Sequence, residues 1–161
     1  MQFEFSWPQG AEDVIKLAIA YVLALPVGLY REKEAHSAGV RTFPLVAMAS
    51  CAYVLLGAPS AHMSLEGQSR IIQGLVAGIG FIGGGAILKS ESLKSDSQVH
   101  GVATAASIWT TGAVGASVAQ NRYLLAATLA LLNLFTLRVL LRVKVRLSDE
   151  KDSKRERDTD L

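Results

Sequence analysis

Hydrophobic positions along the chain form five long runs, and polar positions fall mainly in the short segments between them. Runs of roughly 17–25 apolar residues are typical of transmembrane helices, whereas strands of a membrane barrel would show alternating apolar and polar positions. Because a helix satisfies its own backbone hydrogen bonds in lipid, the pattern predicts an all-α membrane protein, a compact bundle of about five transmembrane helices. The predicted spans are 14–30, 42–58, 71–88, 101–118 and 123–137.

Charged positions are unevenly distributed along the chain. No Asp or Glu occurs from residue 97 to residue 148, and the positions that follow are almost all charged or polar. This division predicts one transmembrane domain over residues 1–142 and a charged tail over residues 143–161. A segment with so few apolar residues cannot bury a core, so we expect most of the tail to be disordered in the cytoplasm. The last span extends toward residue 141 if Arg138 directs its charge to the membrane surface.

The Lys and Arg residues predict which way the helices point. Thirteen of them follow the first, third and fifth runs, whereas only Arg70 and Arg122 fall on the opposite side and Lys16 falls inside the first run. Cytoplasmic segments of membrane proteins carry the excess of basic residues. The N-terminus is therefore predicted outside and the C-terminus inside. The first run has no basic segment before it, so we expect it to be retained rather than cleaved as a signal peptide.

The third run is unusually rich in glycine. Its members are Gly74, Gly78, Gly80, Gly83, Gly84 and Gly85. Two pairs, 74/78 and 80/84, have the four-residue spacing that lets helix backbones approach closely in lipid. One interpretation is tight packing against the fourth run, whose small Ala, Ser, Thr and Gly residues predict a place at the centre of the bundle. The alternative is a helix broken at the triplet 83–85, exposing backbone to an ion or a partner.

Composition excludes several classes of function. The net charge of +2 gives no strong attraction to nucleic acid, and Cys51, as the only cysteine, excludes a disulfide within the chain. No spacing resembles a nucleophile elbow, a catalytic carboxylate pair or a zinc site. We therefore expect a protein that is not an enzyme and has no cofactor or metal site. We expect it to contact the lipid bilayer and not to bind nucleic acid.

Three motifs, in order along the chain, resemble those of the MgtC/SapB family of membrane proteins. Residues 26–32 and 38–43 read PVGLYRE and AGVRTF, similar to the GLxRE and AGxRT signature of that family. Residues 78–87 read GIGFIGGGAI, similar to its GIGFLGAG motif. Residues 99–109 read VHGVATAASIW, similar to its VxGLTTAASIW stretch. The resemblance extends over residues 12–141 and is therefore specific.

The resemblance implies a multipass protein of the bacterial inner membrane that is linked with magnesium homeostasis. It implies regulation of other membrane proteins, among them the proton-translocating ATP synthase, although the family was once described as a magnesium transport component. Two departures limit what is carried over. Tyr30 stands where many members have Glu, and the chain ends at Leu161. We therefore expect a short form that lacks the soluble C-terminal domain of longer members.

The residues favour regulation over transport. Magnesium prefers hard oxygen ligands and gives up its water reluctantly, so a transport path ordinarily contains carboxylates or ordered carbonyl groups. No Asp or Glu lies inside a predicted span, and the charges there are Lys16 and, at the edge of the last span, Arg138. Both repel a divalent cation. A path lined by carbonyl groups stays open, so direct transport of Mg²⁺ or another small ion or solute is the competing hypothesis.

Charged residues gather on the predicted inner side, where the first and third runs end. One interpretation is a pair of solvated loops whose charges only set the orientation. The other is a polar cluster in which Glu32, Arg41 and Lys89 hold fixed positions. The candidate functional residues are Arg31, Glu32, Arg41, Thr42, Lys89 and Thr104. The expected partner is another membrane protein, and the glycine spacing makes a homodimer a candidate assembly.

Overall fold

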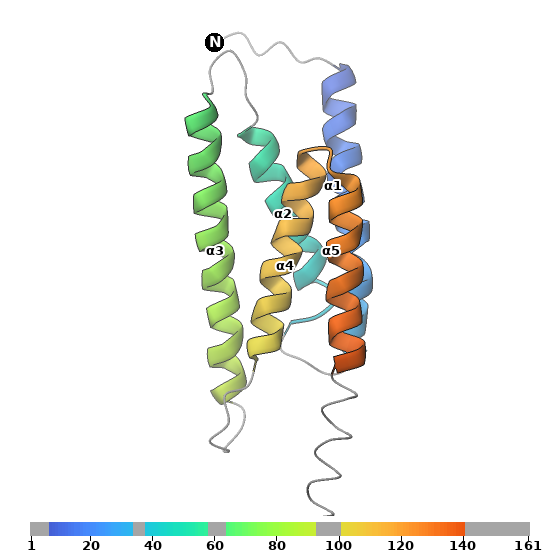
Figure 1. The fold of residues 1–161 in the computed structure, drawn as a ribbon, viewed down its shortest axis with the longest axis vertical. Helices are drawn as coiled ribbons and strands as arrows, with labels where there is room; N and C mark the ends of the chain where they lie inside the picture. Colours follow the sequence, from blue (N-terminus) through green and yellow to red (C-terminus); the bar gives the residue numbers. More distant parts are fainter. Residues whose placement is uncertain (1–6, 34–37, 58–63, 93–100, 141–161) are drawn as a thin grey trace, which may run out of the picture.

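The computed structural model describes residues 7–33, 38–57, 64–92 and 101–140. In these ranges the chain forms five α-helices that run roughly along one long axis (Figure 1). They are α1 (Trp7–Lys33), α2 (Thr42–Leu56), α3 (Leu65–Ser92), α4 (Val102–Ala119) and α5 (Tyr123–Phe135). A π-helical turn, Thr136–Leu140, continues α5. The predicted all-α bundle is confirmed, whereas the tail 143–161 lies outside the described residues.

Each predicted run corresponds to one helix, but two helices begin before their runs. α1 begins at Trp7 and α3 at Leu65. α3 also continues as one helix through residues 83–85, so the alternative of a helix broken at the glycine triplet is wrong. Among the described helices, α1, α3 and α4 are long and apolar enough to cross a membrane, and the apolar segments Thr42–Leu56 and Tyr123–Val139 are shorter.

α4 lies at the centre of the bundle and contacts each of the other four helices. Its small residues explain this position, because helices in lipid associate through close packing rather than through the hydrophobic effect. The approach is closest where α4 crosses α2. A side chain at Gly115 would overlap the carbonyl group of Ala47. The predicted central position of the fourth run is confirmed.

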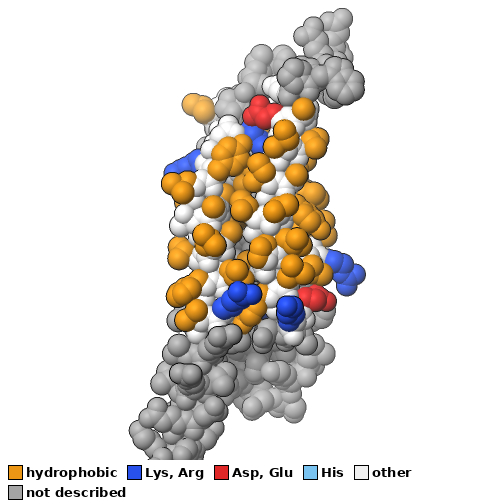
Figure 2. Space-filling view, turned by 90° about the vertical axis from the view of Figure 1, so that its right-hand side faces the viewer, with side chains coloured by type: hydrophobic (Ala, Val, Ile, Leu, Met, Phe, Trp, Pro, Cys, Tyr) orange, Lys and Arg blue, Asp and Glu red, His pale blue; other side chains and the backbone are white. Residues whose placement is uncertain are grey.

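The interior consists mainly of small side chains, and large apolar ones cover the outside. One buried cluster is built from Ala20, Ala24, Ala47, Cys51, Val54, Val114, Val118, Ala119, Ala126 and Ala130. A second contains Val27, Ala38, Phe43, Ile79, Ile108 and Leu137. Figure 2 shows hydrophobic side chains over the middle of one face, with charged side chains toward its two ends. This distribution suits a bundle surrounded by lipid.

α3 stands at the edge of the bundle and packs mainly on α4 (Figure 1). Of the six glycines in the predicted run 71–88, only Gly83 faces another helix closely, where an added Cβ would lie 3.4 Å from the Cβ of Ala105. At the other five glycines an added Cβ would meet no neighbouring atom within 4 Å. The expectation that both four-residue glycine pairs pack against the fourth run is therefore wrong within this chain. Ile79 of α3 is buried instead and packs against Gly112 of α4.

Candidate functional site

The last turn of α1 and the segment before α2 meet in a close contact, which we call the α1–α2 junction. It is formed by Gly28, Glu32, Gly39 and Val40. The Val40 N–H donates a hydrogen bond to Oε2 of Glu32 at 3.0 Å. A Cβ on Gly28 would lie 3.0 Å from the Cα of Val40, and a side chain on Gly39 would overlap the Glu32 carboxylate. The paired motifs at 26–32 and 38–43 thus bring two backbone segments together.

Arg31 precedes Glu32 in the sequence but points into the bundle. It is 2% exposed, and its Nη2 donates a hydrogen bond to Oγ1 of Thr104, which is also 2% exposed. Thr104 lies in the first turn of α4, which begins after Gly101 in a left-handed conformation with φ 91°. A hydrogen bond from a guanidinium group is stronger than one between neutral groups. The structure therefore joins two of the predicted candidates across 73 positions of sequence.

A buried polar seam continues along α4 from Thr104 through Ser107 and Thr111, which share one side of the helix. Ser107 Oγ donates to Oδ1 of Asn133 on α5 at 2.8 Å. Asn133 Nδ2 donates to the Ser107 carbonyl oxygen at 3.2 Å and lies 3.3 Å from Thr111 Oγ1. The seam fixes α5 against α4. Sequence reasoning missed this pairing, and the available signal was Asn133, the only amide side chain in its apolar run.

The end of α5 is attached to α1 through Tyr30. Its hydroxyl group donates to the Leu137 carbonyl oxygen at 3.3 Å, and the guanidinium carbon of Arg138 lies 5.4 Å from the centre of its ring. This distance is within the range of a cation–π contact. Tyr30 stands where many members of the resembled family have Glu. Here its hydroxyl group and its ring both contact the π-helical turn that continues α5.

The remaining candidates lie apart from this buried contact. Arg41 is exposed, Thr42 is half-buried, and both line a groove between α2 and α3. Lys89 belongs to α3, but its side chain is outside the described residues. The described part of the chain shows no ion pair between Glu32 and Arg41, and Oε2 of Glu32 accepts the Val40 N–H. A direct pairing of Glu32 with Arg41 is therefore absent from the described residues, and the cluster of Glu32, Arg41 and Lys89 stays a prediction.

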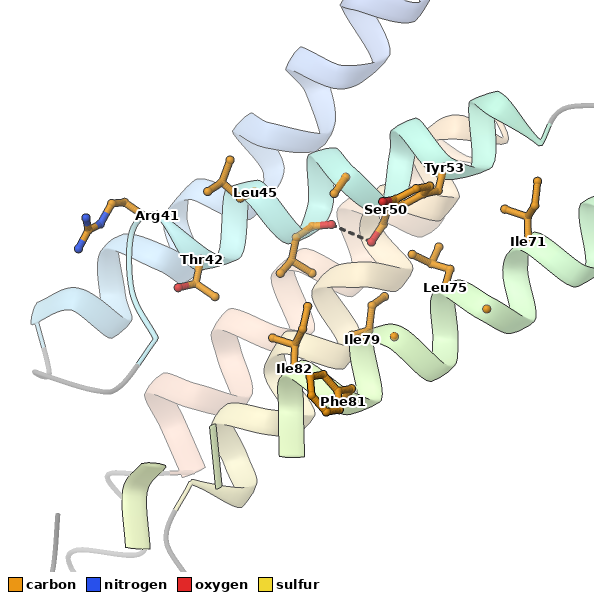
Figure 3. Close-up of a pocket in the computed structure, with 14 residues that line it drawn as sticks. Arg41, Thr42, Leu45, Ser50, Tyr53, Ile71, Leu75, Ile79, Phe81 and Ile82 are labelled. Atoms are coloured by element: carbon orange, nitrogen blue, oxygen red, sulfur yellow. Dashed lines mark hydrogen bonds between the residues drawn. The ribbon is translucent and has the colours of Figure 1, made fainter. Parts of the chain in front are cut away.

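The groove lies between α2 and α3 and has a volume of about 890 Å³. We call it the α2–α3 groove. Figure 3 shows Arg41 at one end of it and Ile71 at the other. Its lining residues are Arg41, Thr42, Leu45, Val46, Ala49, Ser50, Tyr53, Ile71, Gly74, Leu75, Gly78, Ile79, Phe81 and Ile82. The groove is therefore mostly apolar and lies where lipid or another helix would contact the bundle.

The other end of α1 carries a second buried charge. Lys16 is 6% exposed, and its Nζ lies 2.6 Å from Oε1 of Glu12, one turn earlier on the same helix. The pair places the charge that was predicted inside the first span next to a counter-charge. Among the described residues, no three His, Cys, Asp or Glu side chains form a group that could hold a metal ion.

Comparisons with known proteins identify the family. The MgtC family matches residues 17–146. The chain is 37% identical over 110 residues to SrpB of Synechococcus elongatus, covering 64% of this chain and 60% of that protein. It is 30% identical over 147 residues to YhiD of Escherichia coli K12, covering 87% of this chain and 66% of YhiD.

A third relative is MgtC of Salmonella typhimurium, with 31% identity over 121 residues, which is 74% of this chain and 49% of that protein. The chain thus spans between about half and two thirds of the length of these relatives. No solved structure matches it. The matched range contains all three sequence motifs, the α1–α2 junction and the contact of Arg31 with Thr104. This chain is a membrane protein that belongs to the MgtC family.

Proposed function

We propose that this protein is a non-enzymatic accessory or regulatory protein of the bacterial inner membrane, which acts in magnesium or ion homeostasis by packing α3 against another membrane protein. The resemblance to the MgtC/SapB family supports the link with magnesium. The provisional naming of its relative YhiD as a magnesium transporter also supports it. The observation that carries the packing mechanism is an uncovered face of α3.

This face, which we call the outer α3 stripe, consists of Gln73, Ala77, Gly80 and Gly84. Spacings of four, three and four residues bring them to one side of the helix. All four are exposed, and a Cβ added to either glycine would meet no neighbouring atom within 4 Å. In lipid, the small residues Ala77, Gly80 and Gly84 allow a second helix to approach closely and to gain packing energy, and the Gln73 side chain can hydrogen-bond to it.

The interior supports packing over transport. The crossing of α2 and α4 leaves no room for a side chain at Gly115, and the buried polar groups of the seam join helices to each other. A transport path through this centre would have to separate α4 from its neighbours. Direct transport of Mg²⁺ is the second candidate function, and the name of YhiD is the observation that favours it.

A site-specific cross-link tests the packing mechanism. A photoreactive amino acid replaces Ala77 in the full chain, and the cells are irradiated. We expect a discrete covalent adduct, whose mass and peptides show whether the partner is a second copy or a different membrane protein. Gly80→Leu with Gly84→Leu should abolish the adduct, because two large side chains then cover the stripe. Gly74→Leu with Gly78→Leu is the matched control and should retain it.

Two results would contradict the proposal. The first is an adduct that survives the changes at Gly80 and Gly84, because the stripe would then not be the contact. The second is magnesium flux in liposomes. Mg²⁺ should enter liposomes that contain the purified protein no faster than it enters empty liposomes, as reported by an indicator trapped inside. Faster entry would favour the transport alternative.

A further inference from the structure

We propose that the α2–α3 groove binds an anionic phospholipid, with its acyl chains along the apolar walls and its phosphate group at Arg41. This inference goes beyond the proposed regulatory function and does not depend on it. The groove and the outer α3 stripe use different sides of α3. Gly74 and Gly78 line the groove, whereas Gly80 and Gly84 are each six positions further along, a rotation of about 120° around the helix.

The shape and lining of the groove fit a lipid. Its walls are aliphatic or aromatic along most of their length, from Ile71 and Leu75 on α3 to Leu45 on α2 (Figure 3). The Ser50 hydroxyl group donates to the carbonyl oxygen of Val46 at 2.7 Å, so it is already bonded within its own helix. The polar residues Arg41 and Thr42 are together at one end (Figure 3). The groove therefore has an apolar length and one polar end, like the molecule proposed to occupy it.

The charge at this end is available to an anion. Arg41 is exposed and has no ion pair in the described part of the chain. Among the described residues, the nearest carboxylate in sequence is Glu32, and its Oε2 accepts the Val40 N–H in the α1–α2 junction. Lys33, also exposed, ends α1 at the same end of the bundle. Guanidinium groups bind phosphate with two parallel hydrogen bonds, and basic pockets between membrane helices hold anionic headgroups.

A lipid fits the groove better than a second helix does. A spanning helix about 10–12 Å wide and 30 Å long occupies roughly 2,400–3,400 Å³. The groove, at about 890 Å³, is instead within the range of small-molecule sites, roughly 300–1,000 Å³. An apolar helix would also bring no negative charge to Arg41. The positive charge of Arg41 therefore favours an anionic lipid as the occupant of the groove.

Native mass spectrometry of the full chain tests the headgroup contact. The protein is equilibrated in detergent with equal amounts of phosphatidylglycerol and phosphatidylcholine that carry the same acyl chains. We expect a bound phosphatidylglycerol, and Arg41→Gln should reduce its preference over phosphatidylcholine by about fivefold. Arg70→Gln is the matched control, because Arg70 is exposed at the other end of the bundle, 2.7 Å from Glu66. It should leave the preference unchanged.

A second pair of variants tests the groove itself. Gly74→Leu with Gly78→Leu should displace both lipids, because a Cβ added at either position meets no neighbouring atom within 4 Å and the larger side chains would occupy the groove. Gly80→Leu with Gly84→Leu should leave lipid binding intact. Ile82→Trp is a further groove-filling change in case the double variant does not fold. The proposal is overturned if Arg41→Gln keeps the preference, if the groove-filling variants still bind lipid, or if inorganic phosphate alone displaces it.

Discussion

Arg31 and Glu32 are consecutive residues that attach α1 to two different helices. Neighbouring positions on a helix differ by about 100° in direction, so the two side chains cannot point to the same place. Arg31 reaches Thr104 of α4 inside the bundle, and Glu32 accepts the Val40 N–H just before α2. The last turn of α1 therefore fixes where α2 and α4 begin. Loss of either contact should loosen this end of the bundle.

Thr104→Val should reduce the free energy of unfolding by about 1.5–3 kcal/mol, the range for a hydrogen bond to a charged group. Valine has almost the same shape, so the change removes the acceptor of Arg31 and little else. Thr104→Ser keeps the hydroxyl group and should recover most of the stability. The measurement is denaturant unfolding of the purified protein in mixed micelles, followed by circular dichroism.

The control for this change is Thr128→Val. Thr128 is exposed on α5, and its hydroxyl group donates to the Leu124 carbonyl oxygen of the same helix at 2.8 Å. Its substitution should alter the unfolding free energy by no more than about 0.5 kcal/mol. If both substitutions lowered the free energy of unfolding equally, the hydrogen bond between Arg31 and Thr104 would not contribute specifically to the stability of the fold.

At the scale of the elements, glycines perform two separate tasks. On α4, Gly115 allows contact with the backbone of α2, because any side chain there meets the Ala47 carbonyl group. On α3, Gly80 faces outward and an added Cβ would meet no neighbouring atom within 4 Å. In the first case the glycine is required by the fold itself. In the second it leaves a surface to which another helix can bind.

A pair of alanine substitutions separates these tasks. Gly115→Ala should destabilise the bundle by about 1–3 kcal/mol or more, because overpacking against backbone cannot be relieved by a rotamer change. Gly80→Ala should be neutral or stabilise α3 by up to about 1 kcal/mol, since alanine favours the helix more than glycine does. Unfolding in mixed micelles measures both changes. Destabilisation of the same size at the two positions would contradict the assignment.

The sequence predicted the helices well but their neighbours poorly. Apolar runs located five helices because lipid imposes a length and a composition on each span. Glycine spacing is less specific, because it predicts a surface on which a helix can pack but does not identify that helix. For this reason the spacing predicts contact with α4 for the pairs at 74/78 and 80/84, whereas the structure has Gly83, Gly112 and Gly115 at the contacts of α4.

The candidate site was predicted in part for a similar reason. The motifs indicate both Arg31 and Thr104 as candidates, but their contact joins positions 73 residues apart and depends on how α1 packs on α4. Glu32 was expected near other charges, yet it binds a backbone N–H that is invisible in a pattern of side chains. Backbone partners of this kind are learned only from the fold.

On the scale of the whole molecule, the two ends of the bundle differ in charge. Arg31, Lys33, Arg41 and Arg138 lie at the end where α1 finishes, and Arg70 and Arg122 lie at the opposite end. Basic residues near span ends are retained on the cytoplasmic side. The first of these ends is therefore predicted to face the cytoplasm, and Arg41 would then meet the phospholipids of the inner leaflet.

Single-cysteine labelling tests this orientation. Lys33 and Gln120 are exposed at opposite ends of the bundle, and the native Cys51 is fully buried, so it contributes little background. In spheroplasts, a membrane-impermeant maleimide should label Gln120→Cys at once and Lys33→Cys only after permeabilisation. The unmodified chain should remain unlabelled in both conditions. The reverse pattern, or labelling of both positions before permeabilisation, would contradict an outside N-terminus. It would also place Arg41 at the outer leaflet, because Arg41 and Lys33 share one end of the bundle.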